Sequence, residues 1–323
     1  MDIEILLWIQ GLRNSFLDNF FQSITFLAED KFFYYILALV YWCWRKELGL
    51  LMGFYLNLAG IVNTFVKSVV RKPRPFVIDE RLDPVASAKA GATGFSFPSG
   101  HTSQAMSIYG GIAYSGKQKV LRILGGTAAC LAAFSRLYLG VHTPQDVLVA
   151  IIIVIAMMYG VKVVSSYLEK NPKKDILIAF ILILIAIGLA GISYAIPYDT
   201  GDAEMSYVMY KTYMDIVKKL MMLVAFLSCW IWDRRKLKYQ IPDKIWKKAA
   251  VFFIGAISIY WFQQYGKGYI EDICIMYLQK ENGKILARGV SSAILISWVY
   301  GIYPWMIENV RKCIAVLKRS TCD

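Results

Sequence analysis

The sequence predicts an all-α protein, a polytopic bundle of helices that span a membrane. Of its 323 residues, 57% are hydrophobic and only 18% are charged, whereas soluble domains carry about 25% charged residues. Apolar runs close to the ~20 residues needed to cross a hydrocarbon core recur along the chain. Helices satisfy their own backbone hydrogen bonds inside a bilayer, so they are the expected structure of these runs. The runs are too many and too long for the core of a water-soluble protein.

Residues 1–30 form the first predicted unit, an amphipathic N-terminal segment. Apolar residues such as Ile5, Ile9 and Phe16 recur at helical spacing, with polar residues between them. This pattern is typical of a helix that lies at the membrane interface or packs on the bundle.

Nine membrane spans are predicted after this segment, with boundaries that are soft by a few residues. They cover about 32–45, 48–66, 102–116, 120–140, 146–167, 175–197, 213–232, 248–265 and 289–308. The third span is short and contains Gly110 and Gly111, so we expect it to be buried within the bundle. Residues 31–168 hold the motifs described below, and residues 169–323 add about three more helices as a C-terminal extension.

The charge pattern predicts the topology. The net charge is +13, and Lys and Arg residues collect in cytoplasmic connections of membrane proteins. The connections predicted to be cytoplasmic, together with the C-terminus, are the basic ones near residues 45–46, 117–122, 170–174, 234–248 and 311–319. The connections 67–101, 141–146, 198–212 and 266–288 would then face the outside of a bacterial plasma membrane, or a lumen in a eukaryotic host. The first of these is itself basic, against the bias, and a phosphate site would explain that.

Several classes of function are disfavoured. No basic patch lies on a soluble domain, so we expect no nucleic-acid partner. The six cysteines are scattered and show no metal-binding or disulfide spacing, so neither a metal nor another cofactor is expected. The opening stretch is acidic at Asp2 and Glu4, which does not resemble a cleavable signal peptide.

Three segments stand out at the ends of predicted spans. They are Lys67-Ser-Val-Val-Arg-Lys-Pro-Arg-Pro75, Phe97-Pro-Ser-Gly-His101 and Ser135-Arg-Leu-Tyr-Leu-Gly-Val-His-Thr-Pro-Gln-Asp146. The order of the spans places all three segments on the same side of the membrane. We therefore expect them to form one site.

The first requirement of a phosphoryl-transfer site is positive charge around the transferred group. Lys67, Arg74 and Arg136 would supply it, and guanidinium groups suit phosphate oxygens particularly well. Ser99 and Gly100 precede a predicted helix. Backbone N–H groups at such a helix start, together with the Ser99 hydroxyl, can bind an anion.

The chain has only two histidines, His101 and His142, and both lie in these segments. Thr143 is predicted to cap a helix that begins at Pro144, which places Asp146 in its first turn. There the carboxylate can accept a hydrogen bond from one imidazole nitrogen of His142 and leave the other free to attack phosphorus. His101 can then protonate the leaving oxygen.

Each residue alone has a simpler interpretation. Arg71 and Lys72 are interpreted as anchors at a helix end rather than as ligands. Arg136 could form a structural ion pair with Asp146. Ser135 is expected to make local hydrogen bonds, with a phosphate contact as the alternative. Taken together, the spacings favour the functional interpretation.

The three segments resemble the signature of the type-2 phosphatidic acid phosphatase (PAP2) and haloperoxidase superfamily. That signature has Lys, six residues and Arg-Pro; then Pro-Ser-Gly-His; then Ser-Arg, five residues, His, three residues and Asp. Lys67, Arg74 and Pro75, the run Pro98–His101, and the set Ser135, Arg136, His142 and Asp146 match it without a gap.

The resemblance covers roughly residues 1–168 and implies a six-helix membrane core within residues 31–168. It implies that phosphate is bound by Lys67, Arg74, Ser99, Gly100 and Arg136. His142 would form a phosphohistidine with help from Asp146, His101 would act as the general acid, and no metal would be needed. Membrane members of the family act on phosphatidate, isoprenyl phosphates or diphosphates, and sphingoid phosphates. A layout of nine spans is instead similar to that of glucose-6-phosphatase, whose substrate is soluble.

Several hypotheses stay open at this point. The leading one is a membrane phosphatase of a lipid phosphate or lipid diphosphate, whose partners are that substrate and the surrounding lipids. A phosphotransferase with the same intermediate, and a phosphatase of a soluble ester such as glucose 6-phosphate, are the alternatives. A transporter or scaffold that uses the C-terminal helices is a third possibility from another class. The extension could close a lipid entry path or form the interface of a homo-oligomer.

Overall fold

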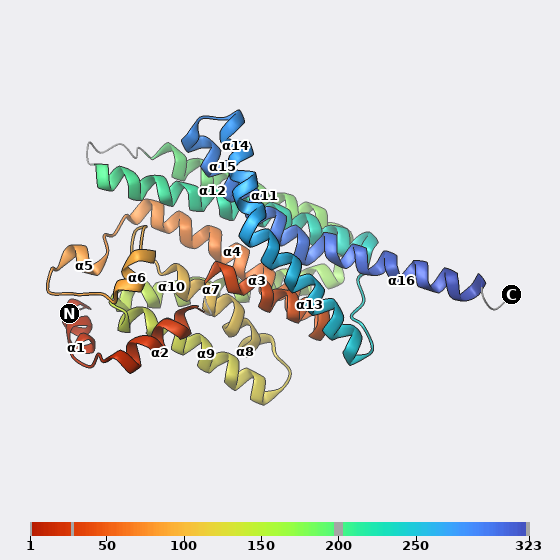
Figure 1. The fold of residues 1–323 in the computed structure, drawn as a ribbon, viewed down its shortest axis with the longest axis horizontal. Helices are drawn as coiled ribbons and strands as arrows, with labels where there is room; N and C mark the ends of the chain where they lie inside the picture. Colours follow the sequence, from red (N-terminus) through yellow and green to blue (C-terminus); the bar gives the residue numbers. More distant parts are fainter. Residues whose placement is uncertain (1, 27–28, 197–202, 321–323) are drawn as a thin grey trace.

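The computed structural model describes residues 2–26, 29–196 and 203–320. Within these ranges all regular secondary structure is helical, which confirms the predicted all-α class (Figure 1). The helices run mostly along the long axis of the molecule. The N-terminus lies at one end, beside α5, and the C-terminal helix extends from the other end.

In the part of the N-terminal half that the structure describes there are ten α-helices, several of them short. They are α1 (Asp2–Gln10), α2 (Ser15–Phe26), α3 (Asp30–Leu39), α4 (Lys46–Val70), α5 (Pro75–Ile78), α6 (Ala86–Gly91), α7 (Gly100–Ala105), α8 (Gly111–Ser115), α9 (Lys119–Tyr138) and α10 (Pro144–Lys170). π-helical turns continue α3 over Val40–Trp44 and join α7 to α8 over Met106–Gly110.

The described residues of the C-terminal half form six more α-helices. They are α11 (Asp175–Ala195), α12 (Ala203–Trp232), α13 (Ile245–Trp261), α14 (Lys267–Tyr277), α15 (Lys280–Ser297) and α16 (Tyr303–Ser320). A short 3₁₀ helix over Pro172–Lys174 precedes α11, and π-helical turns follow α12, α13 and α15 over Asp233–Leu237, Phe262–Gly266 and Trp298–Ile302.

All nine predicted spans fall on helices, and among the described residues six helical segments are long and apolar enough to cross a membrane. These segments are Lys46–Ile78, Lys119–Tyr138, Pro144–Lys170, Pro172–Ala195, Ile245–Tyr277 and Lys280–Leu317. The protein is therefore an integral membrane protein. The predicted spans at 32–45 and 102–116 correspond to helical segments that are too short to count among these six. The span at 213–232 lies on α12, which carries Asp215, Lys218 and Lys219 within the run.

Two predicted connections consist largely of helical residues. The segment 203–212 forms the first turns of α12, and 266–288 forms most of the hairpin of α14 and α15 at the top of Figure 1. Residues 197–202, which include the acidic Asp199 and Asp202, lie outside the described residues. The Lys and Glu residues in 266–288 indicated a loop, but both residue types are good helix formers.

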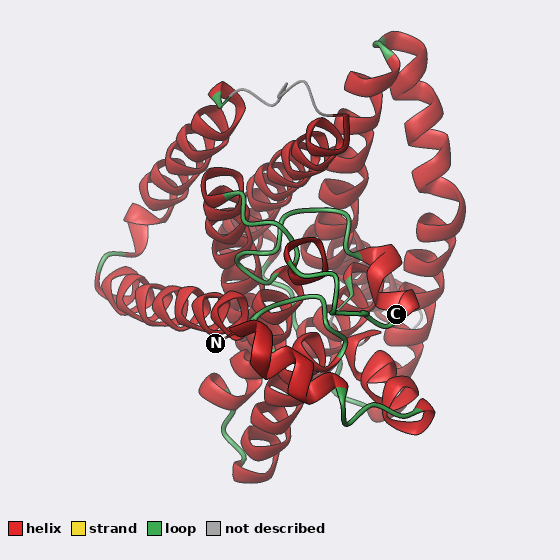
Figure 2. Ribbon diagram, turned by 90° about the vertical axis from the view of Figure 1, so that its left-hand side faces the viewer, coloured by secondary structure: helices red, strands yellow, loops and turns green. Residues whose placement is uncertain are grey.

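The short third span is buried, as predicted. Thr102, Ala105, Ser107 and Ile108 are fully buried where α7 and its π turn pack against α4, α9 and α10. Seen along the long axis from the N-terminal end, loops fill the centre of the molecule and helices surround them (Figure 2). The connections that carry the three motifs lie at this end.

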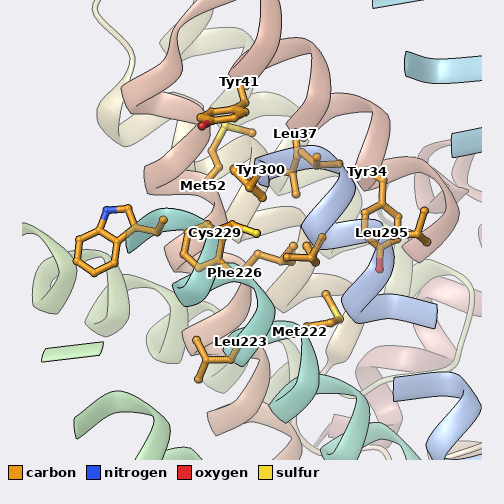
Figure 3. Close-up of a cluster of buried hydrophobic side chains, with 14 of the residues drawn as sticks. Tyr34, Leu37, Tyr41, Met52, Met222, Leu223, Phe226, Cys229, Leu295 and Tyr300 are labelled. Carbon is orange, nitrogen blue, oxygen red and sulfur yellow. The ribbon is translucent and has the colours of Figure 1, made fainter. Parts of the chain in front are cut away.

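One large hydrophobic cluster joins the two halves of the chain. Tyr34 of α3, Tyr41 of the π turn after it and Met52 of α4 lie in one cluster with Phe226 of α12 and Tyr300 after α15 (Figure 3). A Cβ atom on Gly53 would lie 2.3 Å from the Phe226 ring, so glycine allows α4 and α12 to approach closely. The Tyr300 hydroxyl donates to the Gly49 carbonyl at 2.8 Å. The extension thus shares its core with residues 31–168, and the division at residue 168 stays a proposal about function.

The N-terminal segment packs on the bundle. Ile9 and Phe21 are buried in a cluster with Tyr138 and Leu139 at the end of α9. The Arg13 side chain donates to the Tyr138 carbonyl through Nε at 3.0 Å and Nη2 at 2.8 Å. These contacts hold α1 and α2 against the helix that carries Arg136.

Candidate active site

Lys67 and Arg74 fix two loops to the end of α4. Lys67 is buried, and its Nζ donates to the Phe95 carbonyl at 2.5 Å. The Arg74 Nε donates to the Gly94 carbonyl at 2.7 Å, and Nη1 donates to the Val141 carbonyl at 2.9 Å. Both cations are therefore held in place by backbone carbonyls before any anion binds.

The second motif forms the start of α7. Ser99 is the N-cap of this helix, and its hydroxyl accepts from the Thr102 hydroxyl at 2.9 Å and from the Thr102 N–H at 3.4 Å. The Ser99 N–H donates to the Asp146 carbonyl at 2.9 Å, which joins this motif to the third. Ser99 is fully buried and does not line the cavity, whereas Gly100 and His101 do. A contact between the Ser99 hydroxyl and phosphate stays a proposal.

The third motif folds as the sequence predicts at the start of α10. Thr143 is the N-cap, Pro144 is the first helical residue and Asp146 lies in the first turn. The Asp146 Oδ2 accepts from the Thr143 N–H at 2.8 Å. The turn before it contains Gly140, whose φ of 74° suits glycine. This turn presents His142 between α9 and α10.

Hydrogen bonds define the tautomer of His142. The Arg74 Nη1 lies 2.9 Å from the His142 Nε2, and a guanidinium group only donates. Nε2 therefore accepts with its lone pair, and the ring proton resides on Nδ1. Nδ1 lies 3.6 Å from the Asp146 Oδ2 and 3.5 Å from the Ser96 hydroxyl. The nitrogen on the cavity side is thus the one with the free electron pair.

Two residues that support Asp146 were not predicted to do so. The Lys72 Nζ lies 3.0 Å from the Asp146 Oδ1 and donates to the Thr143 hydroxyl at 2.8 Å. The Ser96 hydroxyl donates to the Asp146 Oδ2 at 2.5 Å. Lys72 lies just after α4 and does not line the cavity, but it also forms an ion pair with Asp146 that its interpretation as a helix-end anchor did not include. Its place in a basic run was the one available signal, and nothing in the sequence indicated Ser96.

Arg136 is buried behind the cavity wall. Its Nη1 donates to the Thr25 hydroxyl of α2 at 2.8 Å. The structural ion pair between Arg136 and Asp146 is absent among the described residues, because Asp146 pairs with Lys72. Ser135 makes local hydrogen bonds as expected, to the Ala132 carbonyl at 2.7 Å and with the Thr25 hydroxyl at 2.8 Å. The N-terminal segment thus positions a cation of the third motif.

The motifs meet at a cavity of about 390 Å³. Lys67, Arg74, Gly100, His101 and His142 line it, and residues of α12 and α15 line it too. Asp146 lies behind His142, away from the cavity. The structure therefore brings both histidines and two of the three predicted phosphate-binding cations to one cavity.

Burial keeps both imidazoles neutral. Desolvation lowers the pKa of His142 well below its ordinary value, and the charge on Arg74 lowers it further. Desolvation and then the charge on Arg136 lower the pKa of His101 in the same way. A neutral His142 suits a nucleophile. A protonated His101 requires an added negative charge, which a phosphate would bring.

The described residues contain no group of three or more His, Cys, Asp or Glu side chains that could hold a metal ion. Metal independence stays a prediction of the sequence.

Comparison with known proteins agrees with this arrangement. Residues 48–170 match the PAP2 superfamily. The chain is 26% identical to lipid phosphate phosphatase delta of Arabidopsis thaliana, covering 54% of this chain but only 43% of that protein. It is 31% identical to undecaprenyl-diphosphatase BcrC of Bacillus subtilis, covering 48% of this chain and 79% of that one.

A solved structure is also similar. It is the transmembrane PAP2-type phosphatidylglycerolphosphate phosphatase of Bacillus subtilis, which is 28% identical with a TM-score of 0.43 and covers 51% of this chain and 85% of that one. Each of these matches spans only about half of this chain. The family match contains Lys67, Arg74, His101, His142 and Asp146, the residues whose geometry is described above. The chain belongs to the PAP2 superfamily.

Proposed function

We propose that the protein is a membrane phosphatase that hydrolyses a lipid phosphate or lipid diphosphate through a phosphohistidine on His142. The observation that carries this proposal is the state of His142. Its Nε2 has a lone pair and faces a cavity lined by Lys67 and Arg74, and its Nδ1–H faces the Asp146 carboxylate.

In the first step the phosphate of the substrate enters the cavity. Arg74 releases the His142 Nε2 and turns its N–H groups to the phosphate oxygens, a geometry that guanidinium groups favour. The negative charge of the phosphate opposes the fields of Arg74 and Arg136, which raises the pKa of His101 and lets it take up a proton.

Transfer then proceeds by in-line displacement. The His142 Nε2 forms a bond to phosphorus while the bond from phosphorus to the leaving oxygen breaks. His101 gives its proton to that oxygen. The positive charge that develops on the imidazole is stabilised by Asp146, whose carboxylate is held by Ser96 and the Thr143 N–H.

Hydrolysis of the intermediate completes the reaction. Water attacks phosphorus, the bond from phosphorus to Nε2 breaks, and neutral His101 accepts the proton of the water. Inorganic phosphate leaves and His142 returns to its neutral state. An alcohol in place of water would give a phosphotransferase, so the acceptor decides between the two reactions.

A lipid substrate is supported by the relatives and by the setting of the cavity. The similar proteins are a lipid phosphate phosphatase and an undecaprenyl-diphosphatase. The cavity lies at the end of α4, a helix long and apolar enough to span the bilayer. A lipid could present its phosphate here while its chains stay in the membrane.

The orientation of the protein is part of the same proposal. α16, with Arg311 and Lys312, leaves the molecule at the end opposite α5 and α6 (Figure 1). Basic residues favour the cytoplasmic side. We therefore place the C-terminus in the cytoplasm and the active site on the extracytoplasmic or lumenal face.

The proposal is tested by phosphate release from the purified protein in detergent with EDTA present. The substrates are phosphatidate, undecaprenyl diphosphate, a sphingoid phosphate and glucose 6-phosphate, with His142→Ala as the control. Release from a lipid that disappears in the control supports the proposal, as does acid-labile phosphate trapped on His142. Release from glucose 6-phosphate alone would instead indicate a soluble ester. Unchanged release by His142→Ala, or no turnover and no phosphohistidine with any substrate, would refute it.

A further inference from the structure

Part of the lining of the catalytic cavity comes from the C-terminal extension, outside the segment that matches the family. α12 packs alongside α4, and α15 packs against α12 (Figure 1). They contribute Lys218 and Lys219 from α12 and Arg288 from α15 to the cavity lining. Residues 48–170, the matched segment, contain none of these three cations.

The charge of the cavity exceeds what one phosphate needs. Among the described residues, two acidic side chains line it, Glu29 and Asp215. The cationic side chains that line it are Lys31, Lys67, Arg74, Lys218, Lys219 and Arg288. One of these two acids already forms an ion pair, because the Asp215 Oδ1 lies 2.9 Å from the Arg288 Nη2. A site with this much positive charge suits a ligand with more than one anionic group.

Lys219 is the side chain that points most clearly to an anion-binding role. Its side chain is 8% exposed. Its Nζ is buried and has no hydrogen-bond partner among the residues that the structure describes. A buried ammonium without partners is costly, typically several kcal/mol. Lysines on the lipid side of a helix would instead extend their charge to water.

The backbone of α4 leaves room for this lysine. A Cβ atom on Gly60 would lie 3.2 Å from the Lys219 Cδ and 3.8 Å from its Nζ. Gly60 also lines the cavity, one side of which carries Lys67 on the same helix. The rise from Gly60 to Lys67 is about 10 Å along the helix axis. Both ammonium groups are therefore within reach of one phosphorylated head group.

We propose that Lys219, with Lys218 and Arg288, forms a second anion subsite that binds another phosphate group of the same substrate. The inference rests on the proposed function, because it takes the transferred phosphoryl group to lie at His142. Two kinds of substrate share this chemistry. In a lipid diphosphate the second phosphate is adjacent to the first, and in a phosphatidylglycerophosphate a glycerol separates them.

The test compares substrates with one and two phosphates in wild type and in Lys219→Met, which keeps an unbranched side chain only one atom shorter and removes its charge. The substrates are farnesyl phosphate, farnesyl diphosphate, phosphatidate and phosphatidylglycerophosphate. The matched control is Lys211→Met, on the same helix but outside the cavity lining, where the ammonium lies over the Tyr207 ring.

We expect Lys219→Met to lower kcat/KM at least about tenfold for one of the substrates with two phosphates, the loss typical of one hydrogen bond to a charged group. The value for the matching monophosphate should change less than about threefold, and Lys211→Met should behave as wild type. The substrate that responds identifies the spacing of the two phosphates. Equal losses for substrates with one and two phosphates, or no loss for any, would overturn the proposal.

A binding measurement separates this inference from the proposed function. The midpoint of thermal unfolding, Tm, is measured with inorganic phosphate, pyrophosphate and glycerol 1,3-bisphosphate, which requires no turnover. One of the two bisphosphate probes should raise Tm more than phosphate does in wild type but not in Lys219→Met. If no lipid is hydrolysed and this difference persists, the proposed function fails and the second subsite stands. If lipids are hydrolysed and no such difference appears, the second subsite fails alone.

Discussion

Asp146→Asn is the substitution that tests most directly how His142 is prepared for attack. The carboxylate is fully buried and accepts hydrogen bonds from the Thr143 N–H and the Ser96 hydroxyl, while its Oδ1 pairs with Lys72. An amide keeps the shape but has one oxygen and two N–H groups. Whichever way the amide is turned, its N–H group would therefore face a group that donated to the carboxylate. The acceptor that favours the Nδ1–H tautomer of His142 would be weakened or lost.

The expected loss of activity follows from the geometry. Replacing the aspartate of a catalytic triad by asparagine lowers kcat by about 10⁴-fold, since the histidine then has the wrong tautomer. Here the Asp146 Oδ2 lies 3.6 Å from Nδ1, longer than a strong hydrogen bond, and Arg74 also favours the correct tautomer. We therefore expect a smaller fall in kcat, about 10²- to 10³-fold.

The expected loss of stability is moderate. Breaking a buried ion pair costs about 3–5 kcal/mol when the remaining charge stays buried. The Lys72 side chain is 23% exposed and can reach water, so the cost should be lower, about 1–3 kcal/mol. The Tm in detergent measures this loss, and phosphate release at saturating substrate measures kcat.

Asp175→Asn is the matched control. Asp175 is also a buried carboxylate, paired with Arg235 at 2.5 Å and Arg234 at 3.4 Å, but it begins α11 far from the cavity. It should lower Tm without changing kcat. If folded Asp146→Asn keeps kcat within about tenfold of wild type, or if Asp175→Asn loses as much, Asp146 does not prepare His142 as described.

Three further predictions concern charge in the site. Burial lowers the pKa of His142 and His101 below the ordinary value of 6.5, so the unfolded chain binds more protons than the folded one below that pH. The free energy of unfolding should therefore fall, as the pH drops, by up to about 1.4 kcal/mol per pH unit for each histidine. Tm measured from pH 8 to 5 should show this fall, and the fall should be shallower when both histidines are replaced by Asn. Arg74→Gln should lower kcat/KM by about 100-fold, because the cation beside the His142 Nε2 is lost, and a change of less than about threefold would contradict this role. Thr25→Val removes the acceptor of the Arg136 Nη1 and should lower stability by about 1–3 kcal/mol and raise KM; an unchanged KM would show that Thr25 supports only the fold.

The sequence predicted the site well where neighbouring residues determine the structure. The cap at Thr143, the proline at the first helical position and the place of Asp146 in the first turn all follow from local rules, and all are confirmed. The burial of the short span at 102–116 is confirmed as well. The meeting of three segments followed from the number of spans between them.

Other features escaped the sequence because they depend on contacts between distant segments. Lys72 looked like a helix-end anchor, and only the fold places it 3.0 Å from Asp146, 74 residues later. Ser96 carries no recognisable signal, yet its hydroxyl bonds the same carboxylate. Residues 266–288 were predicted as a connection because of their charge, whereas they form α14 and the first part of α15, which packs against α12.

The sequence by itself determined the class of the protein, the positions of most of its apolar helices and the three motifs, because hydrophobic length and local spacing are properties of short segments. Only the tertiary structure decided which side chains share a cavity. The adjacent pair Lys218 and Lys219 within an apolar run was a signal of function in principle, since buried charges in spans are costly. The direction in which the two lysine side chains point could not be predicted from the sequence, because it depends on how α12 packs against α4. That packing brings the C-terminal extension to the same cavity as His142.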